Sequence, residues 1–254
     1  MKKLLLQLLL PLFLSCVTQE RVERATLIAH AGGAIDSCIY TNSREALELA
    51  AKNGYRFIEF DLQFTSDSIL VAAHSWNEFN QMTDSAHLGD TAPLYADFKS
   101  RRIYGRYTPL SASEVNDFFE FNDSLFLVTD KVSNPEVLHH YFPKLKDRMV
   151  VEAFSYEDYI QLKAEGYYRV LYSCMASDVY ATLLKNLLFN RLLPGGRIEW
   201  MAVHTSAFNV PFFKFIINKV RRFNIALFTV DALDSIPGKY SQRSKMIYTN
   251  YMLP

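Results

Sequence analysis

The sequence is poor in cysteine and has no excess of charge of either sign, and both facts exclude classes of protein. Its 254 residues include three cysteines, too few for a disulfide-rich scaffold. We expect Cys38 and Cys174 to be small buried residues, although pairing in an oxidising compartment stays open. Basic and acidic residues number 27 each, so no charge excess attracts a nucleic acid over a long surface.

Glycine-rich phosphate motifs, internal repeats and low-complexity tracts are also absent. The nine glycines form neither G-x-G-x-x-G nor G-x-x-x-x-G-K-[ST], which weakens the case for a nucleotide-binding sheet. Hydrophobic residues make up 50 % of the chain and charged residues 21 %, as in globular domains rather than disordered chains, collagen-like fibres or coiled coils. The chain is therefore expected to fold around a sizeable core.

The first apolar run is too short to span a bilayer. Two lysines precede residues 4–14, which are apolar except for one glutamine and one proline, whereas a spanning helix needs about 20 residues. A charged start followed by a short apolar region is typical of a secretory signal. The sequence therefore predicts export from the cytoplasm.

The end of this segment resembles the lipobox of bacterial lipoproteins, which are cleaved before a cysteine that is then acylated. Ser15 precedes Cys16, and Phe13 stands where leucine is commoner. We predict a signal peptide over 1–15, acylation of Cys16, and a short tether over 16–25. Several acyl chains on one residue would anchor the protein to the membrane on the periplasmic or surface side of the bacterial envelope. Ordinary signal cleavage and an uncleaved anchor stay open.

From residue 26 onward, short strand-like runs alternate with helical patterns. The helical patterns cover 42–53, 111–121, 156–165, 177–188 and 210–222, and the strand-like runs cover 26–29, 57–62, 69–73, 125–129, 149–154, 168–172, 200–204, 225–230 and 246–248. This alternation predicts a parallel sheet covered by helices.

About eight strands over this length favour a single α/β domain, a TIM (β/α)8 barrel spanning 26–254. The run 69–73 follows its predecessor after only a short polar turn, so it is either a hairpin-like addition or a barrel strand with no helix before it. Residues 77–109 have weak periodicity and are expected to form an insertion over the barrel mouth.

An acidic pair interrupts one of the most apolar runs. Side chains along a strand alternate between its two faces, so Glu59 and Asp61 share one face while the apolar residues between and beside them share the other. If the apolar face packs on helices, both carboxylates point into the barrel. An uncompensated pair there is unfavourable. Either Ca²⁺ or Mg²⁺, or a neighbouring Arg or Lys, can neutralise it.

Two histidines fall at the ends of strand-like runs. His30 follows the first run and His74 follows the run 69–73. Barrel enzymes keep their catalytic groups at the carboxyl ends of the strands, and two imidazoles beside a metal can act as general acid and general base near neutral pH. Gly32 and Gly33 allow the backbone to turn sharply after His30.

Four further residues are candidates for the site. By alternation Lys131 shares a face with Thr129, so it can point inward to bind phosphate or to pair with the acids. Glu152 interrupts another apolar run as a third metal ligand, a partner for Lys131 or a helix-facing charge. His204 and Trp76 are each expected to line the substrate pocket or to pack in the core.

Together these residues resemble the glycerophosphodiester phosphodiesterase family of TIM barrels, within the wider phospholipase C-like phosphodiesterase group. The specific block is 26–76, and beyond it only Lys131 and the run 247–250 look similar. The matching pieces are His30 with its small neighbours, Thr41-Asn42-Ser43-Arg44-Glu45-Ala46-Leu47, Gly54, Glu59-Phe60-Asp61, Thr65-Ser66-Asp67 and Val71-Ala72-Ala73-His74.

The resemblance implies a role for each matching residue. His30 and His74 carry over as the acid/base pair, Glu59 and Asp61 as metal ligands, and Lys131 as a phosphate-side group. It also implies hydrolysis of a phosphodiester such as a glycerophosphoalcohol. Whether a neighbouring glycerol hydroxyl attacks first to give a cyclic phosphate stays open.

Three departures from the family pattern bear on these roles. Ala31 stands where the family has arginine, and Thr41 begins the triplet that reads Glu-Asn-Thr in the family. The third metal ligand of the family lies two residues before the lysine, where this chain has Thr129. Asp130 is one residue out of register, so by alternation it points to the opposite face unless a bulge intervenes. We hypothesise that Glu152, on the next strand, takes over as the third ligand, and whether Asp130 does so instead stays open.

The departures suggest a divergent branch that begins His-Ala-Gly-Gly and acts on a different headgroup. A lipid headgroup, a teichoic-acid-like polymer or an envelope glycan phosphodiester would suit a lipid-anchored monomer. The retained histidines and acids favour a metal-dependent phosphodiester hydrolase. The missing arginine and displaced acid leave open a catalytically degenerate barrel that binds a phosphorylated lipid or glycan at the envelope.

Overall fold

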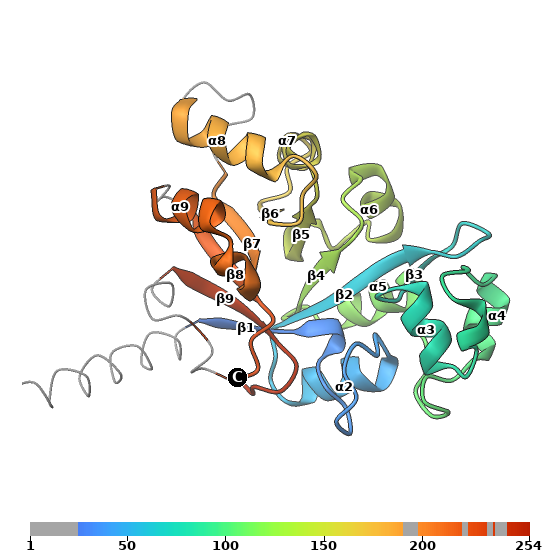
Figure 1. The fold of residues 1–254 in the computed structure, drawn as a ribbon. Helices are drawn as coiled ribbons and strands as arrows, with labels where there is room; N and C mark the ends of the chain where they lie inside the picture. The colour runs from blue at the N-terminus through green and yellow to red at the C-terminus, as the bar shows by residue number, and fades with distance from the viewer. Residues whose placement is uncertain (1–24, 190–197, 220–222, 233–235, 237–242) are drawn as a thin grey trace, which may run out of the picture.

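Eight parallel strands close into a barrel (Figure 1). The computed structural model describes residues 25–189, 198–219, 223–232, 236 and 243–254. The strands follow the order β1-β9-β8-β7-β6-β5-β4-β2, and β1 pairs with β2 to complete the circle. Their bounds are β1 (Thr26–Ala29), β2 (Phe57–Phe64), β4 (Phe126–Asp130), β5 (Met149–Ala153), β6 (Arg169–Ser173), β7 (Trp200–His204), β8 (Asn224–Phe228) and β9 (Ser244–Thr249). The predicted TIM barrel is confirmed.

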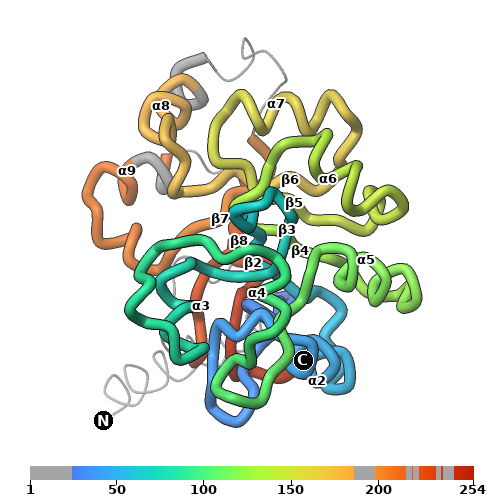
Figure 2. The backbone as a smooth tube through the Cα atoms, turned by 90° about the vertical axis from the view of Figure 1, so that its right-hand side faces the viewer, coloured from blue at the N-terminus to red at the C-terminus, as the bar shows by residue number. Residues whose placement is uncertain are grey.

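Helices surround these strands, as the view from the side of the projecting end of β2 shows (Figure 2). They are α2 (Arg44–Lys52), α5 (Ala112–Phe121), α6 (Pro135–Tyr141), α7 (Tyr156–Ala164), α8 (Val179–Phe189) and α9 (Pro211–Lys219), and short 3₁₀ turns are η1 (His30–Gly32), η3 (Lys146–Arg148) and η4 (Thr205–Asn209). Ser111 and Glu114 form the capping box that begins α5. The sequence pattern misses only α6 of the six helices, a short helix that Asn134 caps with Pro135 in its first turn.

The apolar core has two layers on either side of the strands. Inside the barrel, each strand except β2 gives at least one residue to a single cluster: Ile28, Val128, Val150, Leu171, Ala202, Ala226, Met246 and Tyr248. Outside it, strand residues such as Leu127 pack with helix residues such as Leu47 and Leu162 in a larger cluster. Strand residues of both clusters are apolar, because the sheet is buried on both faces. The sequence of such a strand therefore does not show which of its residues point into the barrel.

A hairpin extends the barrel beside the site. The strand β3 (Leu70–Ala72) runs antiparallel to the projecting end of β2, pairing Leu62 with Ala72. The return brings the chain back to the barrel, where the backbone N–H of Ala73 donates to the carbonyl of Asp61 at 2.9 Å. The run 69–73 is therefore a hairpin addition, the first of its two predicted readings.

A small helical segment follows the hairpin. It contains α3 (Trp76–Met82), η2 (Ala86–Leu88) and α4 (Tyr95–Ser100), which lie beside β3 (Figure 1). Buried Phe79 and Phe98 stack with ring centroids 4.6 Å apart and centre an apolar cluster of its own. This segment falls within the stretch expected to form an insertion.

The structure bears on the predictions for Cys38 and Cys174 but not on those for the N-terminal segment. Cys38 and Cys174 are both free, and only Cys174 is fully buried, while Cys38 is partly exposed. Among the described residues, none of the helices combines the length and apolarity needed to cross a membrane. The predicted signal peptide and Cys16 lie outside the described residues, so both stay predictions.

Candidate active site

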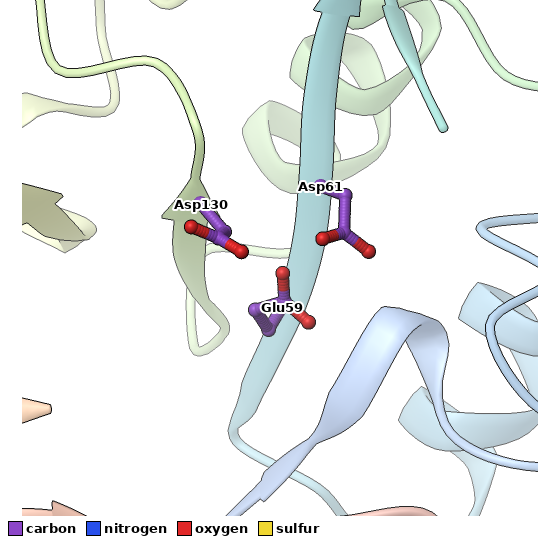
Figure 3. Close-up of side chains that lie close together, drawn as sticks. All are labelled: Glu59, Asp61 and Asp130. Atoms are coloured by element: carbon purple, nitrogen blue, oxygen red, sulfur yellow. The ribbon is translucent and has the colours of Figure 1, made fainter. Parts of the chain in front are cut away.

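Three carboxylates meet at the carboxyl end of two neighbouring barrel strands (Figure 3). Glu59 and Asp61 lie on β2, and Asp130 ends β4, where it pairs in register with Asp61. Each residue offers a carboxylate oxygen within 4.8 Å of the others. We call these three residues the acidic cluster.

The structure corrects the predicted orientation of β4. The sequence analysis placed Lys131 and Thr129 on the inward face, but inward Val128 belongs to the cluster inside the barrel and Leu127 packs outward. Asp130 therefore faces inward by ordinary alternation, without a bulge. The prediction was wrong because both faces of this strand are apolar, so alternation fixes the period but not the phase.

Asp130 stands in the acidic cluster where the sequence analysis expected Glu152. Glu152 does point into the barrel from β5 and is 5 % exposed, but it is not among the residues whose oxygens converge. It forms a side-chain hydrogen bond with Ser173, and burial with the nearby charge of Asp130 raises its pKa well above the usual value. Glu152 thus neighbours the acidic cluster without completing it.

Hydrogen bonds hold only one oxygen each of Glu59 and Asp61. The backbone N–H of Ala31 donates to Oε2 of Glu59 at 2.7 Å, and the side-chain amide of Asn42 donates to Oδ2 of Asp61 at 3.0 Å. The other oxygens, Oε1 of Glu59 and Oδ1 of Asp61, are buried without a hydrogen bond. Lys131 Nζ lies 3.7 Å from Oδ1 of Asp61, which gives partial compensation.

Burial and mutual repulsion make Glu59 and Asp130 of the acidic cluster hard to ionise. Burial, followed by the charges of Asp61 and Asp130, raises the pKa of Glu59 well above its usual value. Burial and the charge of Asp61 raise the pKa of Asp130 to about 7. All donors of the acidic cluster are oxygens, two of the buried oxygens have no hydrogen bond, and the pKa values of Glu59 and Asp130 are raised. These features fit a hard divalent cation, which would offset the repulsion between the carboxylates and bind the two unbonded oxygens.

The acidic cluster should couple the stability of the fold to metal and pH. In metal-free protein the folded Asp130 keeps its proton until about pH 7, whereas its usual pKa is 3.8, so its contribution to stability falls as pH rises through this window. His30, with its pKa lowered from 6.5 to about 4, contributes in the opposite direction, but only below its usual value. Since metal binding displaces the protons, we expect Ca²⁺ or Mg²⁺ to raise Tm more at about pH 8 than at about pH 5.

Thermal unfolding with added ion and with chelator measures this difference directly. A metal-dependent gain on the order of a few kcal/mol at the higher pH corresponds to a Tm shift of roughly 5–10 °C for a chain of this size. An equal Tm with ion and with chelator at both pH values would contradict a metal site in the acidic cluster.

Tyr40 lies between the two candidate catalytic histidines. Its ring centroid is 4.7 Å from that of His30 and 4.9 Å from that of His74. The structure thus brings both histidines to the same end of the barrel as the acidic cluster, His30 on η1 directly after β1 and His74 through the β2–β3 hairpin. Gly32 permits the turn after His30, since its φ is +83° and an added Cβ would lie 3.0 Å from Ala46 Cβ on α2.

His30 is a buried imidazole that stays neutral at physiological pH. It is 8 % exposed, and burial lowers its pKa to about 4 against the opposing charge of Asp61. Its Nδ1 lies 3.0 Å from the hydroxyl of Thr229, and Thr229 in turn shares a hydrogen bond with the hydroxyl of Tyr40. A partner on Nδ1 fixes the ring and leaves Nε2 for chemistry.

His74 occupies a more open position. Its Nδ1 contacts the carboxylate of Glu78 on α3, and its backbone carbonyl accepts a hydrogen bond from the Gln63 amide at 2.6 Å. The His74 side chain is 33 % exposed. The Glu78 contact orients the ring while leaving one edge accessible.

A groove of about 650 Å³ begins at His74 and Lys131. It runs between the β2–β3 hairpin and the start of α6, with Ser133, Asn134 and Asp158 as polar groups. The Ser133 hydroxyl donates to the Asp158 carboxylate at 3.0 Å. The remaining lining is Leu62, Gln63, Phe64, Ser75, Val132 and Val137. This groove offers a hydroxylated group a place next to His74 and Lys131.

Two candidates from the sequence have other surroundings. Trp76 packs its ring against Phe79 and Phe98, at centroid distances of 6.1 Å and 6.3 Å, in the apolar cluster of the helical segment. His204 caps η4, where its Nδ1 accepts from the backbone N–H of Ser206 at 3.1 Å. Both contacts account for these residues structurally, and neither residue lines the groove beside His74.

Sequence reasoning missed the functional setting of Asn42, Tyr40 and Thr229. Asn42 and Tyr40 both adopt positive φ, 48° and 57°, and asparagine is a residue type that tolerates this conformation, so it offered a weak signal. Tyr40 offered none, because its position between the histidines depends on the loop before α2. Thr229 offered no signal either, because it lies 199 residues from His30 in the sequence.

Comparisons with known proteins agree with this geometry. The sequence profile of the "Glycerophosphoryl diester phosphodiesterase family" matches residues 31–188, more than half of the chain. A segment of 64 residues is 39 % identical to Glycerophosphodiester phosphodiesterase 1 of Rattus norvegicus, and 62 residues are 42 % identical to the Homo sapiens protein. Each match spans 18 % of the relative, covering 25 % and 24 % of this chain.

Solved structures share the fold at low identity. A glycerophosphodiester phosphodiesterase from Parabacteroides distasonis has a TM-score of 0.63 and 16 % identity, covering 89 % of this chain and 93 % of that one. One from Thermotoga maritima has a TM-score of 0.63 and 14 % identity, covering 89 % and 94 %. A phosphodiesterase from Oleispira antarctica, solved with the product sn-glycerol-3-phosphate, has a TM-score of 0.58 and 17 % identity, covering 89 % and 93 %.

Proposed function

Because the chain belongs to the glycerophosphoryl diester phosphodiesterase family, we propose that it hydrolyses phosphodiesters of the glycerophosphodiester type by histidine acid/base catalysis. The observation that carries the proposal is the meeting of His30, His74 and the acidic cluster at one end of the barrel. A phosphodiester needs its negative oxygens neutralised, its nucleophile deprotonated and its leaving alkoxide protonated. These groups can supply all three.

The acidic cluster would hold the divalent cation. Bound there, Ca²⁺ or Mg²⁺ would neutralise phosphate oxygens and stabilise charge that develops in the transition state. Lys131 lies beside the same acids and adds a positive charge on the phosphate side. Ala31, which stands where the family has arginine, is fully buried and offers no contact of its own to the phosphate.

The surroundings of the two histidines support different roles. His30, neutral through burial, is suited to accept the proton of the attacking hydroxyl or water. His74 lies at the groove with its Nδ1 on Glu78, which suits it to protonate the leaving alkoxide. The leaving alcohol would occupy the groove, where Ser133, Asn134 and Asp158 favour a hydroxylated group.

The hydroxyl of Tyr40 would supply a phosphate contact in place of the arginine that this chain lacks. For His30 to accept a proton at Nε2, its Nδ1 must donate to Thr229, whose own hydroxyl then donates to Tyr40. The proton of the Tyr40 hydroxyl is then left to donate to a phosphate oxygen. Burial raises the pKa of Tyr40, so the hydroxyl keeps this proton at neutral pH.

Substitution at Tyr40 tests this arrangement. Tyr40→Phe keeps the ring between the histidines and removes the hydroxyl, so we expect kcat to fall roughly 10–100-fold, the effect of losing one supporting hydrogen bond, with little change in KM. Tyr168→Phe is the matched control, because Tyr168 is 70 % exposed. Equal kcat in the two variants would show that the Tyr40 hydroxyl does not contribute to the reaction.

The expected substrate combines this chemistry with the N-terminal segment. If Cys16 is acylated, the enzyme is a lipid-anchored monomer at the bacterial envelope, and its substrates are lipid or glycan headgroup phosphodiesters. The family match supports the reaction class, and the predicted lipid anchor supports a headgroup substrate.

A degenerate barrel that binds a phosphorylated lipid or glycan without turnover is the second candidate. The buried Ala31 in place of arginine favours it. A pure binder, however, has no use for a neutral buried histidine and a second histidine on a carboxylate. The acid/base pair therefore favours the enzyme.

Hydrolysis assays decide between the two. The protein is incubated with bis(p-nitrophenyl) phosphate and with a panel of glycerophosphodiesters, with Ca²⁺, with Mg²⁺ and with chelator. Turnover that depends on a divalent ion is the expected result. Tight binding of the phosphodiesters without turnover under any of these conditions would instead establish the binding protein.

A further inference from the structure

An exposed apolar surface lies on α8 and α9, outside the candidate active site. Tyr180 and Leu184 lie one helical turn apart on α8, and Phe212 and Phe215 lie one turn apart on α9, with exposed fractions of 52 %, 43 %, 40 % and 52 %. The rings of Tyr180 and Phe212 are 5.4 Å apart, and both views place the two helices side by side (Figures 1 and 2). We call these four residues the α8–α9 patch.

The α8–α9 patch reaches the end of the barrel that carries the acidic cluster. Tyr180 is in the first turn of α8, which follows β6, and Phe212 is in the first turn of α9, which follows β7. In a parallel barrel these first turns lie at the carboxyl ends of the strands. Met175 after β6 and Val210 before α9 are also exposed, at 69 % and 39 %, and carry apolar residues into the loops at this end.

The charges on the two helices of the α8–α9 patch are of one sign. The chain as a whole is balanced, yet α8 and α9 carry three lysines, Lys185, Lys214 and Lys219. The acids near these helices in sequence are Asp178, which accepts hydrogen bonds from the hydroxyls of Tyr172 and Thr182 at 2.6 Å and 3.2 Å, and Glu199. Neither α8 nor α9 contains an acid, and the three lysines on these helices are exposed. Glu199 itself is paired with Lys163 at 3.5 Å.

This combination selects one kind of partner. Exposed aromatic and aliphatic side chains flanked by lysines suit the interface of an anionic bilayer, where the rings enter the headgroup region and the amines meet lipid phosphates. A second copy of the chain suits it less, because a twofold contact would bring the same lysines against each other. We propose that the α8–α9 patch docks on a membrane surface that contains anionic lipids.

Docking here has a consequence for the substrate. It would hold the barrel mouth at the height of the headgroups, so the accessible phosphodiesters are those in the plane of the membrane. The docking goes beyond the proposed hydrolysis and does not depend on it. Only the identity of the docked substrate rests on the proposed function.

Fluorescence of the full chain on vesicles tests the docking. Phe212→Trp places a reporter in the α8–α9 patch, and Phe121→Trp is the matched control, because Phe121 is 89 % exposed at the carboxyl end of α5, away from the barrel mouth. Emission is recorded on vesicles of phosphatidylcholine and phosphatidylglycerol, with and without brominated chains, and the signal of the parent chain is subtracted. We expect a blue shift and bromine quenching for Phe212→Trp, and neither for the control.

The lysines supply a second measurement in the same experiment. Each of Lys185→Gln and Lys214→Gln, made in the Phe212→Trp chain, should weaken docking on anionic vesicles by roughly fivefold. High salt should act in the same direction. Docking that ignores both salt and the lysines would overturn the electrostatic part of the proposal.

Three outcomes overturn the docking itself. They are no quenching of Phe212→Trp, equal quenching of both reporters, and a blue shift without vesicles that grows with protein concentration, which would assign the surface to self-association. Hydrolysis of a soluble phosphodiester is measured separately on each variant. Docking without any hydrolysis would leave the α8–α9 patch intact and reject the proposed function, so the two failures are distinguishable.

Discussion

Replacing His30 with alanine is expected to lower kcat by roughly 10²–10⁴-fold, the usual contribution of a positioned general base. The imidazole is buried, its pKa is lowered to about 4, and Thr229 fixes its Nδ1, so no neighbouring group can take over its proton. KM should change little, because Lys131 and the cation that the acidic cluster would hold are left to bind the phosphate.

The same loss is expected for His74→Ala, and the double variant should lose little more than either single one, since the two histidines serve the same transition state. His139→Ala is the matched control, because His139 is an exposed histidine on α6. Kinetics on bis(p-nitrophenyl) phosphate give the comparison. Unchanged turnover in the His30→Ala, His74→Ala double variant would reject the catalytic assignment.

Asp130→Asn is expected to abolish metal-dependent activity and at the same time to stabilise the metal-free protein. Loss of one oxygen ligand should lower kcat/KM by roughly 10³-fold, because a bound cation contributes several kcal/mol to the transition state. The metal-free fold, however, is relieved of a buried carboxylate whose pKa has been raised to about 7 by burial and Asp61. Its Tm at about pH 8 should therefore rise.

Glu152→Gln is the comparison that tells the two acids apart. Both residues are acids at inward positions, but only Asp130 shares the acidic cluster. We expect Glu152→Gln to retain metal affinity within about tenfold, as for a group outside the ligand set. Calorimetric titration of Ca²⁺ and Mg²⁺ into both variants measures this. Loss of affinity in Glu152→Gln with retention in Asp130→Asn would restore Glu152 as the third ligand.

The fold was accessible from sequence because its signals are local. Alternation of strand and helix patterns predicted the barrel, and the polar turn at 66–68 made the hairpin of β2 and β3 one of two predicted readings. What could not be predicted is the phase of β4, because a strand apolar on both faces has no polar side to point outward. Because of this ambiguity, Glu152 rather than Asp130 was expected to join Glu59 and Asp61 as a metal ligand.

The candidate site was accessible only where its residues are close in sequence. Glu59 and Asp61 sit two apart on one strand, and His30 and His74 follow strand-like runs, so their roles could be proposed from spacing. The Thr229 and Tyr40 contacts join segments far apart in sequence, and only closure of the barrel brings them together. Trp76 shows the converse. It is close to His74 in sequence, yet its ring packs against Phe79 on α3 and Phe98 on α4.

The β2–β3 hairpin ties the strand that carries Glu59 and Asp61 to His74 through sixteen consecutive residues, from Glu59 to His74. One residue added to its turn would slip the register of β3 and carry the imidazole to the opposite face, so this length is under tight geometric control. The segment that follows β6 meets the end of β7 instead, since the backbone N–H of His204 donates to Sγ of Cys174 at 3.2 Å. A change of length after β6 or β7 would therefore leave the spacing between Glu59 and His74 intact.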